Sequence, residues 1–217
     1  PMAKIHFLNV DEGDCSIIEH DNGNVTMIDI CCGNIEERKL TTEMFCDSAC
    51  QIRGNFNQKA YPTNPVEYLN RYNIKHIFRY IQTHPDMDHM DGLKNLVNSK
   101  LIINFWDTAN TKEQSFDEHG NCGRYKKEDW DCYQRLRKSE DNPKSLTFYD
   151  GTTAKYFAED DNGALSNDYL KILSPTKELI KVAEAAGDWN DSSYVILYFI
   201  QGRKLLFCGD AGMGTIN

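Results

Sequence analysis

The segment at residues 82–92, QTHPDMDHMDG, places two histidines and three acids within eight positions. It follows His76–Gln82, whose apolar pattern predicts a buried strand, and it runs into Asp91–Asn98, which has a helical pattern. A strand fixes where the loop begins, and the loop can then direct several side chains at one point. The segment therefore predicts an α/β protein with a metal site at the end of a strand.

The flanking sequence also alternates between strand and helix patterns, which favours an α/β fold. Three strands are predicted at 4–10, 15–20 and 25–30, and the sequence DNGN between the last two is a strong hairpin signal. A helix is predicted with Asn64 as its N-cap, Pro65 at its first position and Glu67 at the capping-box position.

The later part of the chain continues this alternation. We expect strands at 101–106 and 169–173, a helix at 177–186, and a hairpin formed by 194–200 and 203–208. Two polar segments, at about 34–60 and 107–145, look like insertions in a single domain over residues 2–217. The centre of the second, KKEDWDCYQRLRK, predicts a surface helix in which Trp130 and Tyr133 pack against the protein.

Charge and composition exclude several classes of function. The 217 residues carry a net charge of -9, which argues against passive adhesion to nucleic acid or to an anionic membrane. An enzyme that acts on nucleic acid stays open, because bound divalent cations supply positive charge that the sequence count omits. No apolar stretch approaches the ~20 residues of a membrane helix, and no signal peptide is visible, so we expect a cytoplasmic protein with no membrane partner.

The eight cysteines form no CxxC pair, and their spacing does not suggest a disulfide framework. Free thiols in a reducing compartment are therefore expected. Cys46 and Cys50 could share one face of a helix and bind a metal, but without a second pair of ligands this is the weaker interpretation.

The spacing within the histidine-rich loop predicts two neighbouring centres. His84 and Asp86 can face one centre while Asp88 and His89 face another, and Gly92 lets the chain turn close to the site. A polar surface loop with incidental histidines is the alternative, and each further fixed position of the pattern weighs against it.

The segment THPDMDH resembles the T-H-x-H/D-x-D-H signature of hydrolases with the metallo-β-lactamase fold. IHFLNVDEGDCSIIEHDNGNVTMIDICCG, DYLKILSPT and NDSSYVILYFIQGRKLLFCGDAG resemble the subgroup that includes the soluble domain of the competence protein ComEC. The resemblance covers most of the chain outside the polar insertions. It implies an αββα sandwich.

The resemblance also implies roles for individual residues. Asp29 matches the acid that supports the site, and Asp210 matches the carboxylate that bridges two metals. The implied ligands of two divalent ions, Zn²⁺ or Mn²⁺, are His84, Asp86, Asp88, His89 and Asp210. Such ions supply an activated water, and Asp88 is the catalytic residue expected to orient that water and accept its proton.

This chain departs from the family pattern at three places. Asp86 replaces the commoner His, and an oxygen-rich site favours Mn²⁺, Fe²⁺ or Mg²⁺. The third-motif His is absent, which leaves Asn190, Asp191 or His119 as its substitute. The final strand–helix segment and its His are also missing, so we expect a fragment, a second chain that completes the site, or a degenerate centre.

The function implied by the resemblance is a phosphodiesterase or nuclease that acts on DNA or nucleotides. A hydrolase of a small ester, lactone or thioester is the alternative, because the same fold carries all of these activities. A non-catalytic binding module with a degenerate site is a third hypothesis.

Overall fold

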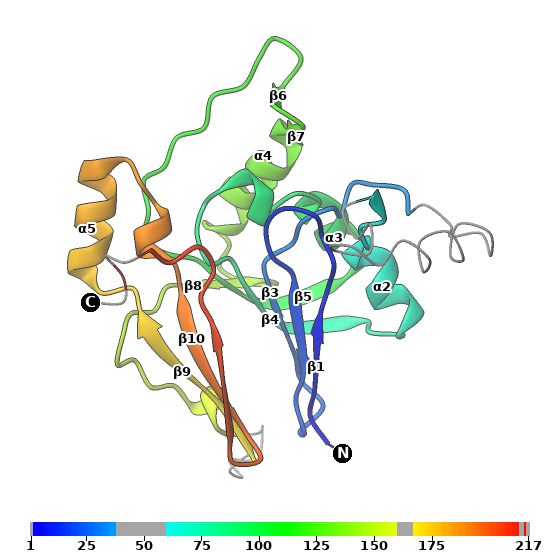
Figure 1. The fold of residues 1–217 in the computed structure, drawn as a ribbon, viewed down its shortest axis with the longest axis vertical. Coiled ribbons are helices and arrows are strands. Elements are labelled where there is room, and N and C mark those ends of the chain that lie inside the picture. Colours follow the sequence, from blue (N-terminus) through cyan, green and yellow to red (C-terminus); the bar gives the residue numbers. More distant parts are fainter. Residues whose placement is uncertain (1, 38–59, 160–166, 213–214, 216–217) are drawn as a thin grey trace, which may run out of the picture.

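Two β-sheets pack face to face in the computed structural model, which describes residues 2–37, 60–159, 167–212 and 215 (Figure 1). The larger sheet has the strand order β1-β2-β3-β4-β5-β8, and the smaller has the order β11-β10-β9. The larger sheet is built from β1 (Lys4–Phe7), β2 (Ser16–Glu19), β3 (Val25–Ile28), β4 (His76–Ile81), β5 (Leu101–Trp106) and β8 (Lys144–Leu146). The smaller is built from β9 (Asp168–Ser174), β10 (Val195–Ile200) and β11 (Arg203–Phe207).

The larger sheet changes from antiparallel to parallel pairing at β3. Strands β1, β2 and β3 form the predicted antiparallel meander, with Ser16 paired to Ile28. From β3 onward, β4, β5 and β8 are parallel neighbours. Parallel strands are covered on both faces, which explains why Tyr80 and Ile81 of β4 are both fully buried.

The space between the sheets is an apolar core. The larger sheet contributes Ile18, Ile28, Ile81 and Trp106, and the smaller contributes Leu170, Ile172, Ile196 and Tyr198. Side chains of β9 alternate strictly between buried and exposed, as expected for a strand with one covered face. The α/β class and the two-sheet core of the predicted sandwich are therefore confirmed.

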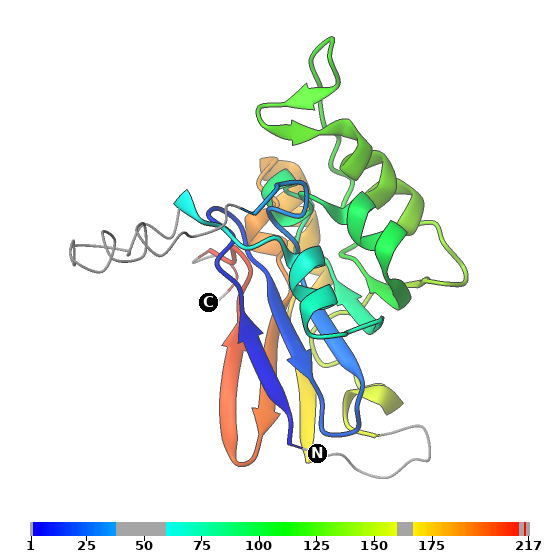
Figure 2. The same ribbon diagram turned by 90° about the vertical axis from the view of Figure 1, so that its right-hand side faces the viewer.

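Three helices cover the other face of the larger sheet: α2 (Pro65–Arg71), α3 (Leu93–Ser99) and α4 (Lys127–Leu136). Figure 2 shows them, in cyan to green, on the opposite side of the blue strands from the orange and red strands of the smaller sheet. Their buried side chains form a second apolar core with the sheet, and include Leu69, Leu93, Leu96, Trp130 and Tyr133.

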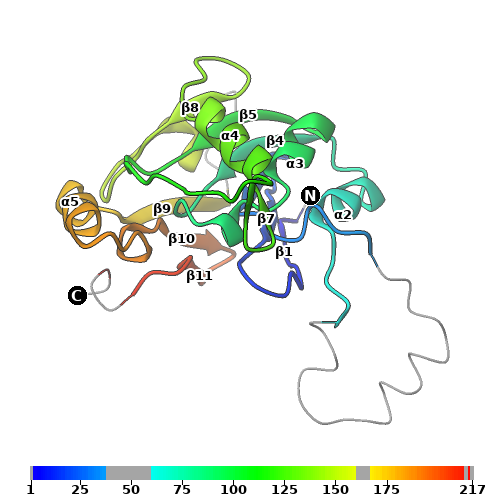
Figure 3. The same ribbon diagram turned by 90° about the horizontal axis from the view of Figure 1, so that it is seen from above.

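The fourth helix, α5 (Lys177–Ala186), follows β9 and lies beside the smaller sheet, on the far side of the molecule from α2 (Figure 3). Short 3-10 turns complete the described elements: η2 (Met87–His89), η3 (Lys155–Phe157) and η4 (Asn190–Ser192). No helix in the described part of the chain is long and apolar enough to cross a membrane.

The structure corrects one local prediction and confirms another. Asn64 caps α2 as predicted and accepts from Val66 N at 2.9 Å. The backbone N–H of Asn64 donates to Glu37 Oε1 at 2.9 Å, and not to Glu67 as the capping box predicted. Helix α4 packs against the protein through Trp130 and Tyr133, as predicted, and Cys132 and Leu136 extend this buried face.

The polar segment at 107–145 contains α4 and a short hairpin of β6 (Asn121–Cys122) and β7 (Tyr125–Lys126), which projects at the top of Figure 1. Residues 38–59, most of the other polar segment, lie outside the described residues, as do Cys46 and Cys50.

A buried polar network connects the two sheets. The Asp168 carboxylate of β9 accepts from the Tyr198 hydroxyl at 2.6 Å and contacts His20 Nδ1, which follows β2. His20 Nε2 lies 2.8 Å from Thr26 Oγ1 in β3. Burial alone would raise the pKa of Asp168, but the hydrogen bonds from His20 and Tyr198 outweigh it and hold that pKa well below its ordinary value.

Replacing Asp168 by Asn should therefore remove a pH-dependent part of the stability. Because the folded-state pKa is depressed, ionised Asp168 stabilises the fold at neutral pH, and this contribution is lost as the pH falls below the unfolded-state value of about 3.9. We expect Asp168→Asn to lower the free energy of unfolding at neutral pH by about 2 kcal/mol. We also expect the free energy of unfolding, measured by urea denaturation, to fall less steeply with decreasing pH in Asp168→Asn than in the original protein.

The exposed turn residue Asp150 provides the matched control. Asp150→Asn should change neither the stability at neutral pH nor its dependence on acid. An Asp168→Asn protein that keeps the full acid sensitivity of the original would contradict this account.

Candidate metal centre

The loop after β4 is shaped by a buried glutamine. The Gln82 amide donates to the carbonyl oxygens of His84 and His89, each at 2.9 Å, which draws both ends of the loop together. Gly92 closes the loop at φ 99°, and a Cβ there would lie 2.3 Å from the Gly33 Cα. Only glycine satisfies both demands, so the close turn predicted at Gly92 is present.

The buried Asp29 carboxylate anchors the loop through hydrogen bonds to Thr83 and His89. Asp29 follows β3, has a φ of 55° and is fully buried. Its carboxylate accepts from Thr83 N at 2.7 Å and from Thr83 Oγ1 at 2.5 Å, and its Oδ2 lies 2.8 Å from His89 Nδ1. A proton on Nδ1 that is donated to Asp29 leaves the lone pair of His89 on Nε2, as in metal sites where a carboxylate orients the ligating histidine.

The two histidine rings lie together, with centroids 4.2 Å apart. The Nε2 atoms of His84 and His89 are both buried, and neither has a hydrogen-bond partner in the described part of the chain. A buried polar nitrogen without a partner is costly, by about 1–3 kcal/mol. Divalent metal binding at these atoms would remove this cost.

Carboxylates surround the two Nε2 atoms. Asp210 Oδ1 lies 3.3 Å from His89 Nε2, and Asp210 Oδ2 lies 4.0 Å from His84 Nε2. Asp86 Oδ2 is 3.9 Å from His84 Nε2, whereas Asp88 Oδ2 is 3.7 Å from His89 Nε2. The five side chains therefore converge in the two pairs that their spacing suggests, with Asp210 between the pairs.

The electrostatics of the cluster favour positive charge at His89 and disfavour it at His84. Burial and the neighbouring His89 ring lower the pKa of His84. Burial also opposes charge on His89, but the carboxylates of Asp29 and Asp210 prevail and raise the pKa of His89 to about 11. His89 in turn lowers the pKa of Asp210. A site that stabilises positive charge so strongly at a buried position is suited to a cation.

The donor set fits divalent metal binding. His84, His89 and Asp210 each offer a ligand atom, and these atoms all lie within 4.8 Å of one another. Imidazole nitrogens and carboxylate oxygens together suit Zn²⁺, Mn²⁺ and Fe²⁺. The metal-ligand roles of His84, Asp86, Asp88, His89 and Asp210 remain predictions, and the geometry supports them.

Of the three substitutes for the third-motif histidine, His119 lies away from this cluster, because its side chain is 76% exposed and contacts Glu118. Asn190 and Asp191 lie in η4. A Cβ on Gly212 would be 2.5 Å from Asp191 Oδ1, so Asp191 lies beside the segment that follows Asp210.

Asp14 belongs to the site region, although no motif of the sequence assigned it a role. Its carboxylate forms a group with Asp29 and His89 in which the ligand-type atoms lie within 4.8 Å of one another. The turn reaches the loop because a Cβ on Gly13, at φ 66°, would lie 2.1 Å from the Asp88 carbonyl oxygen. The available signal was an acid directly after the glycine of a DEGD turn, between two strands.

Lys112 is a second residue that the sequence did not reveal. Its Nζ donates to Asp86 Oδ1 at 2.6 Å, and its side chain is 19% exposed. It comes from the polar segment at 107–145, 26 residues away from Asp86. No local sequence pattern predicts a contact between residues as far apart as Lys112 and Asp86.

Comparison with known proteins gives a structural match alone. No protein-family model matches the chain. No curated protein matches it either. Among solved structures, the α/β fold matches that of a HARLDQ-motif mutant of a metallo-β-lactamase from Cronobacter sakazakii, with a TM-score of 0.42 and 10% sequence identity.

That match covers 95% of this chain and 63% of the other, so this chain spans less than two thirds of that protein's length. The function proposed below is therefore based on the side chains of the cluster.

Asp29→Asn tests whether the buried carboxylate orients His89 for metal binding. An Asn amide that donates to Nδ1 would place the imidazole proton on Nε2, where it blocks a cation. We expect the affinity for Mn²⁺ or Zn²⁺, measured by titration calorimetry, to fall by about 10–100-fold. Asp131→Asn, an exposed change on α4, is the control and should leave the affinity unchanged.

Proposed function

We propose that the protein is a metal-dependent hydrolase that cleaves phosphodiester bonds in DNA or nucleotides. One observation carries this proposal: the two oxygens of Asp210 face the partnerless Nε2 atoms of His84 and His89, one oxygen toward each ring. A carboxylate in this position is suited to bridge two cations, each bound by one histidine and one further acid.

Two divalent ions at this site would supply an activated water and electrostatic stabilisation of the charge that develops during hydrolysis. The residues of the chain have separate tasks. His84, Asp86, Asp88, His89 and Asp210 would hold the ions, and Asp29 fixes the ring of His89. Asp88 remains 32% exposed at its side chain, so its carboxylate is accessible to a water molecule, which it orients and from which it accepts a proton.

A phosphodiester substrate is supported by the charges around the cluster. Asp86 in place of an imidazole makes the site richer in oxygen, which suits the metals that handle phosphate. Lys112 brings an ammonium group to the rim beside Asp86, where it can pair with a substrate phosphate. The resemblance of the sequence to the ComEC-like subgroup points in the same direction.

The first test is cleavage of single- and double-stranded DNA by the full-length chain with Mn²⁺. We expect cleavage that EDTA stops and that His84→Ala abolishes. Asp88→Asn should lower kcat by about 100-fold or more, because it keeps the shape of the side chain but removes the proton acceptor. Gel assays and single-turnover kinetics provide the measurement.

Other outcomes of this test separate the competing functions. Cleavage that persists in both EDTA and His84→Ala would overturn the proposal. Hydrolysis of chromogenic esters without cleavage of DNA or nucleotides would identify an ester, lactone or thioester hydrolase instead. A full-length chain that binds less than one transition metal ion would be a binding module with a degenerate site.

Lys112→Ala tests whether the ammonium group contacts substrate phosphate. We expect KM for DNA to rise by about 10-fold, with a smaller effect on kcat, because a charge-assisted hydrogen bond contributes about 1.5–3 kcal/mol. Lys127→Ala is the matched control, since Lys127 pairs with Asp131 on the exposed face of α4. Equal effects of the two substitutions would exclude a specific contact at Lys112.

A further inference from the structure

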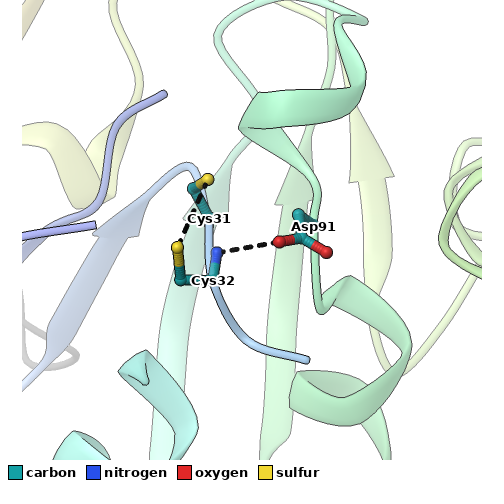
Figure 4. A group of neighbouring side chains, drawn as sticks. All are labelled: Cys31, Cys32 and Asp91. Atoms are coloured by element: carbon teal, nitrogen blue, oxygen red, sulfur yellow. Dashed lines mark hydrogen bonds between the residues drawn. The ribbon is translucent and has the colours of Figure 1, made fainter. Parts of the chain in front are cut away.

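Two adjacent buried cysteines lie close in sequence to Asp29, which supports the proposed hydrolytic site. Cys31 and Cys32 follow Asp29 and Ile30 at the end of β3, they are 0% and 2% exposed, and both are free thiols. Their Sγ atoms are 3.9 Å apart, and Asp91 lies beside them (Figure 4). The hydrolytic mechanism proposed above uses none of these three side chains.

The backbone is held in an unusual conformation that brings the two sulfurs together. Cys32 has a φ of 62°, a left-handed conformation that is uncommon for a residue with a side chain. Two hydrogen bonds to Asp91 maintain it: Cys32 N donates to Asp91 Oδ2 at 3.1 Å, and Gly33 N donates to the Asp91 carbonyl at 2.9 Å. Backbone strain that the surroundings enforce is frequently associated with a functional site.

The spacing of the three side chains matches a metal site. One ligand atom from each of Cys31, Cys32 and Asp91 lies within 4.8 Å of the other two. Thiolates that bind one zinc ion at about 2.3 Å in a tetrahedral arrangement are about 3.8 Å apart. The observed 3.9 Å is close to that separation.

The carboxylate has capacity left for an ion. Asp91 Oδ2 accepts from Cys32 N, and Asp91 Oδ1 accepts from the Asn34 amide at 2.7 Å. Each carboxylate oxygen can accept a further interaction, because an ionised carboxylate offers about four lone-pair sites.

Charge balance also fits a divalent ion. Two thiolates and one carboxylate carry three negative charges, which a buried site must neutralise. Arg124 Nη2 lies 3.8 Å from Cys31 Sγ, but its guanidinium also pairs with Asp11, so a divalent ion would supply most of the positive charge. The Arg124 side chain is 43% exposed, so it marks the side from which an ion could enter.

We propose that Cys31, Cys32 and Asp91 form a second metal site, which takes a thiophilic divalent ion of the zinc type. Soft thiolate ligands select such ions over Mg²⁺ or Mn²⁺. The site joins the two segments that build the hydrolytic centre, since Cys31 follows two residues after Asp29, and Asp91 two residues after His89. Its role is structural: the ion fastens the loop after β4 to the end of β3.

The experiment is a titration of the protein with Cd²⁺, in a phosphine reductant that keeps the cysteines reduced. The readout is the ultraviolet charge-transfer band between sulfur and cadmium. The band reports thiolate ligands, so metal at the His84 and Asp210 centre does not contribute to it. We expect the intensity of one Cd²⁺ ion held by two thiolates, whatever further Cd²⁺ the His84 and Asp210 centre takes up. Asp210→Ala should leave it unchanged, which separates this site from the proposed hydrolytic function.

Cysteine variants locate the band. Cys31→Ser and Cys32→Ser should each reduce it by about half or more, because each removes one of two sulfur ligands. Cys132→Ser, a change of another buried free cysteine, is the matched control and should leave it intact. A band that survives both Cys31→Ser and Cys32→Ser, or that requires Cys208 instead, would overturn the proposal.

Asp91→Asn tests the site without removing either sulfur, so the proposal can still be tested if the serine variants misfold. We expect the same band at saturation, but a Cd²⁺ affinity that is about 10-fold weaker. Circular dichroism checks the fold of each variant. Absence of a sulfur–cadmium band in the folded original protein would also refute the site.

Discussion

The buried carboxylate of Asp29 connects the end of β3 to the loop that carries the histidines, and the geometry of the site depends on that connection. It accepts two hydrogen bonds from Thr83 and orients the ring of His89 through Nδ1. Because Gln82 also holds the carbonyls of His84 and His89, the loop has little freedom to rearrange. The outcome is two buried imidazole nitrogens in close proximity, with carboxylates as their nearest charged neighbours.

The polar segment at 107–145 also helps to hold the histidine loop in place. Asp129 of α4 accepts from Gly92 N at 3.0 Å and from Lys94 N at 2.8 Å, so one helix caps the start of another. Arg124 donates to Asp11 at 3.0 Å in the turn that carries Asp14. The segment thus supports both the loop after β4 and the turn before β2, and it supplies Lys112 to the rim.

Local patterns in the sequence were sufficient to predict the strands, most helices and the convergence of the histidine loop. Strands β4 and β5 are predominantly apolar, and the spacing of His84, Asp86, Asp88 and His89 already divides these four residues into two pairs. The contacts that escaped prediction join distant segments: Glu37 with Asn64, Asp129 with α3, and Lys112 with Asp86. No periodicity or spacing rule encodes such contacts, since each depends on how separate elements pack.

The central proposal is that Asp210 would be shared between two metal ions, which His84 and His89 would help to hold. Electron paramagnetic resonance of the protein loaded with Mn²⁺ tests it most directly, because ions about 3.5–4 Å apart under a shared carboxylate are magnetically coupled. The account predicts a spectrum of a coupled pair, which Asp210→Ala converts to that of isolated ions. A spectrum of isolated Mn²⁺ in the unaltered protein, at full loading, would contradict it.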